Sequence, residues 1–228
     1  MTITIDEIRQ ALDKLPADIS LGGKIASDLL ANSAGEVPCD IHLGWDLQIS
    51  RLCDRTWGAF NNTLMRHIRK LEVSGTDIAP ILAAAQLEDH HWKWLDKALH
   101  YKGDAYKWFF LVAEKYPQAA CMIYHPRASV ASEGNVFYIE YLAVAPWNRE
   151  NALSERVFKG VGPKLLSYVV NYAQDVLKLK PGFSLHSLPK AADFYEKKLK
   201  MTPFPKYDKD GMKFFEWIAP KIALEAAS

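Results

Sequence analysis

Residues 135–145 read NVFYIEYLAVA, and residues 158–166 read FKGVGPKLL. The first run is long and largely apolar, which predicts a central strand with both faces covered. In the second run, Gly160 and Gly162 bracket one residue at the start of a helix. Glycines there let the backbone approach a ligand, and free N–H groups at a helix N-terminus favour an anion such as a pyrophosphate. Pro163 suits the first turn of that helix. The segment therefore predicts an anion-binding loop, with an ordinary tight turn as the alternative.

The residues around this unit predict strands mixed with helices. Aromatic and β-branched residues at 107–114 and the apolar run at 119–124 flank a turn-like KYPQ, which predicts a β-hairpin. The further elements predicted along the chain are a helix through Leu177, a strand at 183–186, a helix at 191–199 and two short strands near 203–207 and 212–218.

The first hundred residues predict helices instead. Apolar residues recur every three or four positions over 49–71, and again over 78–99, as on one face of a helix. Before residue 45 the expected elements are a helix near 5–15, a second near 22–31 and a loop around Gly35 and Pro38. Helices followed by strands with two further helices predict an α+β (α/β) fold, with a mixed, mostly antiparallel sheet flanked by helices and a helical N-terminal extension.

Composition excludes several classes of protein. A net charge of +1 argues against a dedicated polyanion binder. The three cysteines lie far apart without a CxxC pair, which predicts reduced thiols in a cytoplasmic protein and neither disulfides nor zinc. Adjacent His90 and His91 point apart on a helix and lack metal-ligand spacing, so we expect no metal. No apolar run is long enough to span a membrane, and the first residues do not resemble a signal peptide.

The strand, loop and helix at 135–177 resemble the central motif of the GNAT superfamily of acyl-CoA-dependent N-acetyltransferases. In that motif a splayed strand runs into a loop of pattern (Gln/Arg)-x-x-Gly-x-(Gly/Ala) and then a helix. The downstream stretch LHSLPKAADFYEKKLKM resembles the second motif of the family, a short strand and a helix with Ala-x-x-Phe-Tyr-Glu-Lys. The resemblance covers 135–201. It implies a GNAT-like acyl-CoA-binding core at 105–220, after a helical region at 1–104 and before a tail at 221–228.

The resemblance also implies a binding site for acetyl-CoA as co-substrate. The strand backbone at Leu142, Ala143 and Val144 would pair with the pantetheine arm and polarise the thioester carbonyl. The loop would supply N–H groups around the pyrophosphate. Its residues are Phe158, Lys159, Gly160, Val161, Gly162, Pro163 and Lys164.

Two side chains are the candidate catalysts. Tyr195 matches the family tyrosine that protonates the departing thiolate, a role that suits a hydroxyl with a pKa near 10; the alternative is an aromatic plug in the core. Glu140 is a carboxylate within an apolar strand, where burial would raise its pKa toward that of a useful base for the amine. The alternatives for Glu140 are a partly exposed strand residue or one that only positions the substrate. His186 is the second candidate base.

The sequence departs from the family motifs at three places. Val157 stands where the motif has Gln or Arg, so Arg156 and Lys159 are the candidates to replace that contact with phosphate. The loop at 145–157 is longer than the common form and is expected either to shape the acceptor site or to have no role. Leu188 stands where an Asn is usual.

The function predicted is transfer of an acetyl group from acetyl-CoA directly to a primary amine. The acceptor is left open among a small amine, a protein amine and an aminoacyl-tRNA. Nine lysines against four acidic residues over 178–213 favour the last only mildly, so nucleic acid is expected only if the acceptor is tRNA. The alternative function is a non-catalytic module that keeps the fold to bind CoA or a partner. We expect a monomer or a homodimer.

Overall fold

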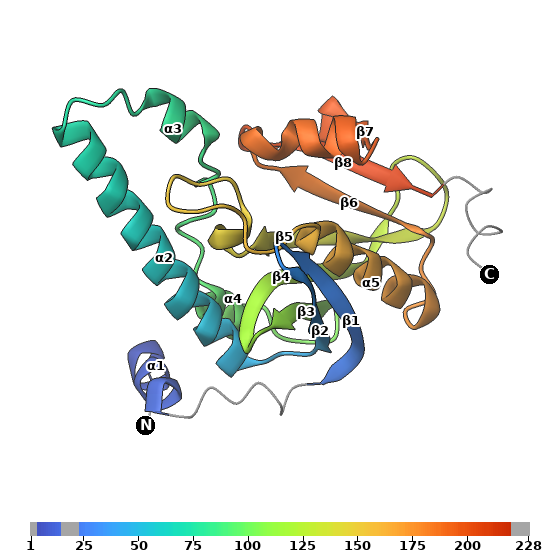
Figure 1. The fold of residues 1–228 in the computed structure, drawn as a ribbon. Helices are drawn as coiled ribbons and strands as arrows, with labels where there is room; N and C mark the ends of the chain where they lie inside the picture. The colour runs from blue at the N-terminus through green and yellow to red at the C-terminus, as the bar shows by residue number, and fades with distance from the viewer. Residues whose placement is uncertain (1–3, 15–22, 220–228) are drawn as a thin grey trace. The chain divides into compact units, whose positions relative to one another are not determined.

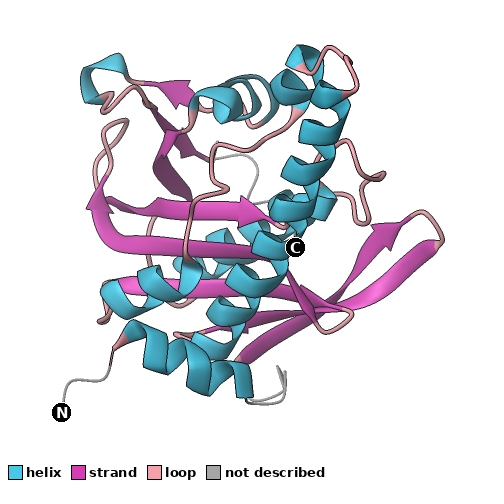
Figure 2. Cartoon of the chain, turned by 90° about the vertical axis from the view of Figure 1, so that its left-hand side faces the viewer, coloured by secondary structure: helices cyan, strands magenta, loops and turns pink. Residues whose placement is uncertain are grey.

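The computed structural model describes residues 4–14 and 23–219. Within them, eight strands form one mixed sheet in the order β1-β2-β3-β4-β5-β6-β8-β7, accompanied by helices (Figures 1 and 2). The strands are β1 (Lys24–Asn32), β2 (Gly35–Leu43), β3 (Tyr106–Ala113), β4 (Tyr116–Ala128), β5 (Asn135–Val144), β6 (Gly182–Ser187), β7 (Thr202–Pro203) and β8 (Lys213–Ile218). The α-helices are α1 (Ile5–Lys14), α2 (Leu47–Val73), α3 (Ala79–Ala84), α4 (Trp94–His100) and α5 (Val161–Asp175). The predicted α+β class with a mixed, mostly antiparallel sheet is confirmed.

The chain divides into two compact units. Unit 1 comprises residues 1–120 and 142–165, and unit 2 comprises residues 121–141 and 166–228. The hairpin of β3 and β4, the strand β5 and the helix α5 all lie where the sequence predicted them. The predicted tail at 221–228 lies outside the described residues.

The N-terminal hairpin of unit 1 corrects the sequence prediction. Residues 24–43 form β1 and β2, so the helix expected near 22–31 and the loop expected at Gly35 and Pro38 are wrong. A short apolar run such as that of β1 fits a helix or a strand equally well. The hydrogen bonds between strands favour the strand, because β2 pairs with β1 on one edge and with β3 on the other, where Ile41 lies opposite Leu111.

Helix α2 begins as expected and packs one face into unit 1. The side chain of Asp46 accepts a hydrogen bond from the Ile49 N–H at 2.8 Å, which caps the first turn. The α2 residues buried on this face are Ile49, Ser50, Leu52, Cys53, Trp57, Leu64 and Ile68.

The helix predicted over 78–99 is interrupted, giving α3 and a separate α4. The carboxylate of Asp54, on α2, explains why a new helix starts at Trp94. It accepts hydrogen bonds from the N–H groups of Trp94 at 2.6 Å and Leu95 at 3.2 Å. Helix N–H groups without an internal partner need such an acceptor. Helix α4 consequently lies beside the first half of α2 (Figure 1).

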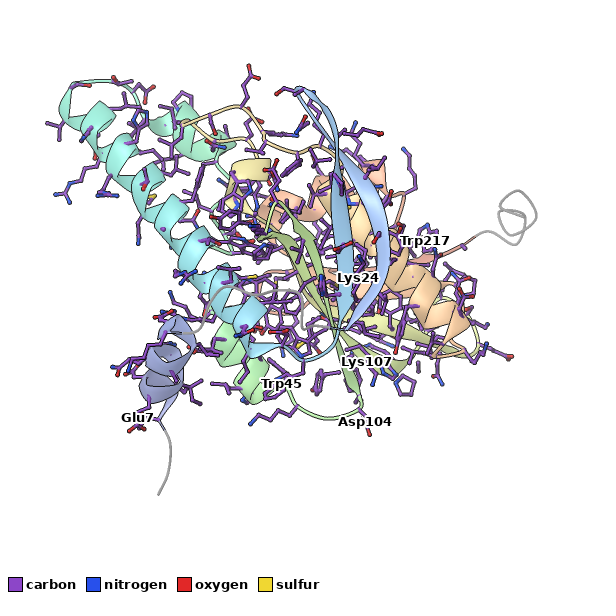
Figure 3. All side chains as sticks on the ribbon, turned by 60° about the horizontal axis from the view of Figure 1, so that its bottom comes forward. Glu7, Lys24, Trp45, Asp104, Lys107 and Trp217 are labelled. Atoms are coloured by element: carbon purple, nitrogen blue, oxygen red, sulfur yellow. The ribbon has the colours of Figure 1, made fainter. Side chains whose placement is uncertain are left out.

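Aromatic residues join α4 to the rest of unit 1. The ring of Trp94 meets Trp57 edge-on at 5.6 Å and Trp108 of β3 at 6.3 Å between centroids. Trp45, labelled in Figure 3, donates its ring N–H to the carbonyl of Ala98. These rings are buried apart from Trp45, which is about half exposed.

Unit 2 is built on β6, which pairs in parallel with β5 and antiparallel with β8. The helix predicted at 191–199 is present as a helical stretch over 189–198, with a 3₁₀ turn at Pro189–Ala191 and a π-helical turn at Phe194–Lys198. The strand predicted near 203–207 shrinks to Thr202–Pro203, and Pro205–Tyr207 forms a 3₁₀ turn. Two prolines without N–H groups prevent a longer ladder there.

A buried residue of α2 and its exposed neighbour allow a test of this packing. Leu64 is 2% exposed and Met65 is 45% exposed. We expect Leu64→Ala to lower the free energy of unfolding by about 2–5 kcal/mol, because it leaves a cavity. Met65→Ala should change it by less than about 0.5 kcal/mol. Urea denaturation followed by circular dichroism measures both, and equal effects would contradict the described face of α2.

Candidate functional site

The glycine loop before α5 has part of its backbone already engaged. The N–H of Phe158 donates to Oδ1 of Asn148 at 3.0 Å, and the N–H of Lys159 donates to the carbonyl of Ala31 at 3.0 Å. Proline has no N–H to give, so Pro163 cannot contribute either. Of the loop residues predicted to donate N–H groups to a pyrophosphate, Phe158, Lys159 and Pro163 therefore do not have one to offer.

Three loop N–H groups lack a hydrogen-bond partner among the described residues, those of Gly160, Val161 and Gly162. They lie at the N-terminus of the fifteen-residue helix α5, where the helix dipole also favours negative charge. Gly160 has a φ of 70°, a conformation that favours glycine. At Gly162, an added Cβ would lie 3.2 Å from Cγ2 of Val144, so a larger residue would require the Val144 side chain to shift.

A buried polar network fixes both ends of the segment between β5 and α5. Its centre is Gln118, which is 2% exposed. Oε1 of Gln118 accepts from Nε1 of Trp147 at 2.8 Å and from Nδ2 of Asn148 at 2.9 Å, and its backbone carbonyl accepts from Ala145 at 2.8 Å. Asn148 in turn holds Phe158. This network positions the glycine loop, and the sequence offered no signal for Gln118 beyond a polar residue beside an apolar run.

The N-terminal hairpin supports the same loop from another side. Besides the bond from Lys159 to the carbonyl of Ala31, Nζ of Lys164 lies 2.6 Å from a carboxylate oxygen of Asp28 on β1. The isolated bridge between Ala31 and Lys159 makes the loop an extension of the hairpin edge. Lys164 is therefore committed in part to a protein carboxylate.

The end of β5 is tied to a distant segment by Arg149. Its Nε donates to the carbonyl of Val144 at 2.7 Å, and its two terminal nitrogens lie 2.6 and 2.5 Å from the carboxylate oxygens of Asp89. The paired side chains are only 14% and 13% exposed. The long loop at 145–157 is thus anchored at its first turn, and Arg149 is a residue that the sequence did not single out for this role.

Strand β5 runs beyond its parallel partner. The described register with β6 ends at the pair Ile139 and Leu185, whereas β5 continues to Val144. Leu142, Ala143 and Val144 therefore have no pairing partner on β6. Of these three residues, Ala143 is buried and the other two are partly exposed. A strand edge without a partner strand presents backbone groups that can bond to an extended ligand, although the carbonyl of Val144 on this edge already accepts from Arg149.

In unit 2, the candidate base Glu140 is half-buried and lies near Tyr138. Burial and then the charge of Glu140 raise the pKa of Tyr138 to about 12. The hydroxyl of Tyr138 lies 2.6 Å from Nδ1 of His186, and Nε2 of His186 lies 2.8 Å from the carbonyl of Tyr207. Since a carbonyl only accepts, Nε2 carries the hydrogen and Nδ1 accepts from the phenol. His186 thus has both nitrogens engaged, which disfavours it as the second candidate base.

The other candidate catalyst, Tyr195, lies in the π-helical turn and is 9% exposed. Its ring lies among Phe194 and Phe215, at 5.4 and 6.3 Å between centroids. Burial, and to a lesser degree Cys121, raise the pKa of its hydroxyl well above the usual value. A neutral hydroxyl suits a proton donor and equally suits a core aromatic, so the role of Tyr195 stays a prediction, as does that of Glu140.

The described residues contain no group of three or more His, Cys, Asp and Glu side chains placed to hold a metal ion. None of the helices in the ranges 4–14 and 23–219 is long and apolar enough to cross a membrane.

No protein-family model matches the chain, and no curated protein is similar enough in sequence to count as a relative.

Solved structures similar to this chain include three acetyltransferases. One is a Desulfovibrio desulfuricans protein assigned to the GNAT family, with a TM-score of 0.47 and 14% identity over 79% of this chain and 98% of that one. The second is the Thermoplasma acidophilum PaiA N-acetyltransferase with coenzyme A, with a TM-score of 0.46 and 9% identity over 78% and 99%. The third is the Campylobacter jejuni N-acetyltransferase PseH with acetyl coenzyme A, with a TM-score of 0.37 and 19% identity over 59% and 80%. Likenesses of this degree decide neither activity nor substrate.

The buried network predicts a large effect at Asn148. We expect Asn148→Ala to lower the free energy of unfolding by about 1–3 kcal/mol, because it leaves the Phe158 N–H unsatisfied. Amide hydrogen exchange should also speed up over residues 158–162. The control is Asn171→Ala on the exposed side of α5, which should leave both quantities unchanged. Similar exchange in the two variants would show that the network does not hold the loop.

Proposed function

We propose that this chain is an N-acetyltransferase of the GNAT type, which moves an acetyl group from acetyl-CoA to a primary amine. The observation that carries the proposal is the set of three N–H groups without a partner among the described residues, at Gly160, Val161 and Gly162, beside the end of β5. A loop of this kind fits a pyrophosphate, and the edge of β5 beyond its register with β6 fits an extended amide chain. CoA carries both groups.

The residues present fit acetyl-CoA without the side chain that the family motif places at position 157. Val157 is 40% exposed and offers no charge. Arg156 and Lys159 are exposed beside it, so we expect their cations to meet the phosphates in place of Gln or Arg. Lys164 would contribute less, because Asp28 already pairs with it.

Bound acetyl-CoA supplies the acetyl group as an activated thioester. In the transfer a C–N bond replaces the C–S bond, the amine loses one proton and the thiolate gains one. Glu140, directly or through a water molecule, would accept the proton from the amine. Tyr195 would give its proton to the sulfur, which suits a hydroxyl that stays neutral because its pKa is raised. Backbone N–H groups at Leu142–Val144 would polarise the carbonyl.

The acceptor remains open among the three classes that the sequence leaves: a small amine, a protein amine or an aminoacyl-tRNA. We expect a nucleic-acid partner only in the last case. A monomer or a homodimer in the cytoplasm remains our expectation.

One observation favours a second function, a non-catalytic module that binds CoA or a partner. Tyr195 is almost fully buried among aromatic rings, as a core residue would be. This second function predicts no transfer to any amine, with or without binding of CoA.

Calorimetric titration with acetyl-CoA tests the loop. We expect binding by the natural protein and at least about a tenfold loss in Gly160→Asp, because the added carboxylate repels phosphate. Gly211→Asp is a matched control, since Gly211 has a φ of 76° against 70° for Gly160 and neither has an atom within 4 Å of an added Cβ. Equal binding by both variants, or none by the natural protein, would remove the proposal.

Acetyl transfer to a panel of primary amines tests the catalysts. Glu140→Gln and Tyr195→Phe should each lower kcat by about 10²-fold or more while leaving acetyl-CoA binding intact. The controls are Glu133→Gln and Tyr116→Phe, at exposed positions, which should keep full turnover. If neither Glu140→Gln nor Tyr195→Phe changes the rate, both assignments fail; if the natural protein binds acetyl-CoA without any transfer, the binding module is the better explanation.

A further inference from the structure

A cavity in unit 1 lies against one face of α2, at positions spaced three and four residues apart. Its α2 wall includes Asp54, Trp57, Gly58 and Asn61. The rest of the lining comes from Asp89, His90, Trp92, Lys93 and Trp94, and from Pro146 and Arg149 after β5. The space open to the centre of a water molecule is about 30 Å³. One water needs roughly 10–15 Å³ of such space. The cavity therefore accommodates a small head group and not a whole metabolite.

Gly58 leaves room in this wall without a conformational reason to be glycine. It lies inside the 27-residue helix α2, where glycine is less favourable than alanine. A Cβ added there meets no atom within 4 Å. The missing side chain thus leaves the space at the cavity wall open.

Asn61, one turn further along α2, presents an unsatisfied acceptor. Its side-chain oxygen Oδ1 is buried and has no hydrogen-bond partner in the described residues. A buried polar atom without a partner is costly and calls for an explanation such as an absent ligand. Because the atom is an oxygen, the group that would satisfy it must donate a hydrogen.

The remaining walls favour a donor that is also a cation. Three tryptophans line the cavity, Trp57, Trp92 and Trp94. Indole faces attract cations, and that of Trp92 already does so, since Nζ of Lys97 lies 5.2 Å from its ring centroid. Asp54 adds a carboxylate that the N–H groups of α4 engage but do not neutralise. The other acid, Asp89, is already paired with Arg149. Lys93 and His90 also line the cavity. Both are exposed, a ring nitrogen of His90 already bonds to the carbonyl of Leu87, and the side chain of Lys93 can turn to solvent.

We propose that this cavity binds the ammonium group of a primary aliphatic amine. The ammonium donates to Oδ1 of Asn61 and lies against the tryptophan rings, with its charge near Asp54. That the bound amine is the acceptor of the acetyl group rests on the proposed function. That the cavity binds an ammonium group does not depend on it. The link to the reaction is Arg149, which lines the cavity and also bonds to the carbonyl of Val144 at the end of β5.

Calorimetry with butylammonium chloride at neutral pH, without acetyl-CoA, tests the binding. We expect saturable binding that butan-1-ol, a neutral molecule of the same chain length, does not reproduce. Gly58→Leu should fill the cavity and weaken binding by at least about tenfold. Ala59→Leu, at the next and exposed position of α2, adds the same bulk away from the cavity and should bind as the natural protein does.

A second pair of variants tests the charge preference, independently of cavity filling. Asn61→Asp should tighten butylammonium binding by about tenfold, because it makes the hydrogen bond charge-assisted. Asn62→Asp places the same charge at an exposed position one residue away and should change it little. Equal binding of butan-1-ol, no effect of Gly58→Leu, or no gain in Asn61→Asp over Asn62→Asp would overturn the inference.

The two proposals fail separately. Binding of acetyl-CoA without binding of butylammonium would overturn the cavity inference and leave the proposed function standing. Binding of butylammonium without binding of acetyl-CoA would support the cavity and remove the proposed function.

Discussion

The amide of Gln118 makes hydrogen bonds through every part of its side chain. Nε2 donates to the carbonyls of Ala113 at 3.0 Å and Tyr116 at 3.3 Å, while Oε1 accepts from Trp147 and Asn148. A buried amide with all its capacity used is rigid, and a half-satisfied one is destabilising. The β3–β4 turn, the first turn after β5 and the glycine loop thereby share one support. The N–H of Phe158, at the start of the glycine loop, is held by this network through Asn148.

The N-terminal hairpin takes on a function that its sequence did not suggest. It adds two strands to the sheet, and its Ala31 and Asp28 engage the backbone and a lysine of the glycine loop. The loop is therefore fixed by the buried network on one side and by β1 on another.

Much of the fold could be predicted because its signals are local. The strand at 135–144, the helix after Gly160 and the hairpin of β3 and β4 follow from patterns of a few residues. The site was less predictable, because the hydrogen bonds that hold it join residues far apart in the sequence. Gln118 and Asn148 are 30 positions apart, and Arg149 and Asp89 are 60 positions apart. No pattern in one sequence reports such pairs. The hairpin at 24–43 was missed for a related reason, since only its pairing with β3 distinguishes it from a helix.

The bridge between Ala31 and Lys159 has a consequence for solubility as well. Strand β1 is the first strand of the sheet order, with Ile25 and Leu29 each more than two-fifths exposed. An open edge with apolar residues is a template on which another chain can add a strand and begin to aggregate. The bond from the loop occupies the backbone of β1 near one end, and the charged Lys24, labelled in Figure 3, stands at the other. The contact that shapes the glycine loop also shortens the edge that a second molecule could reach.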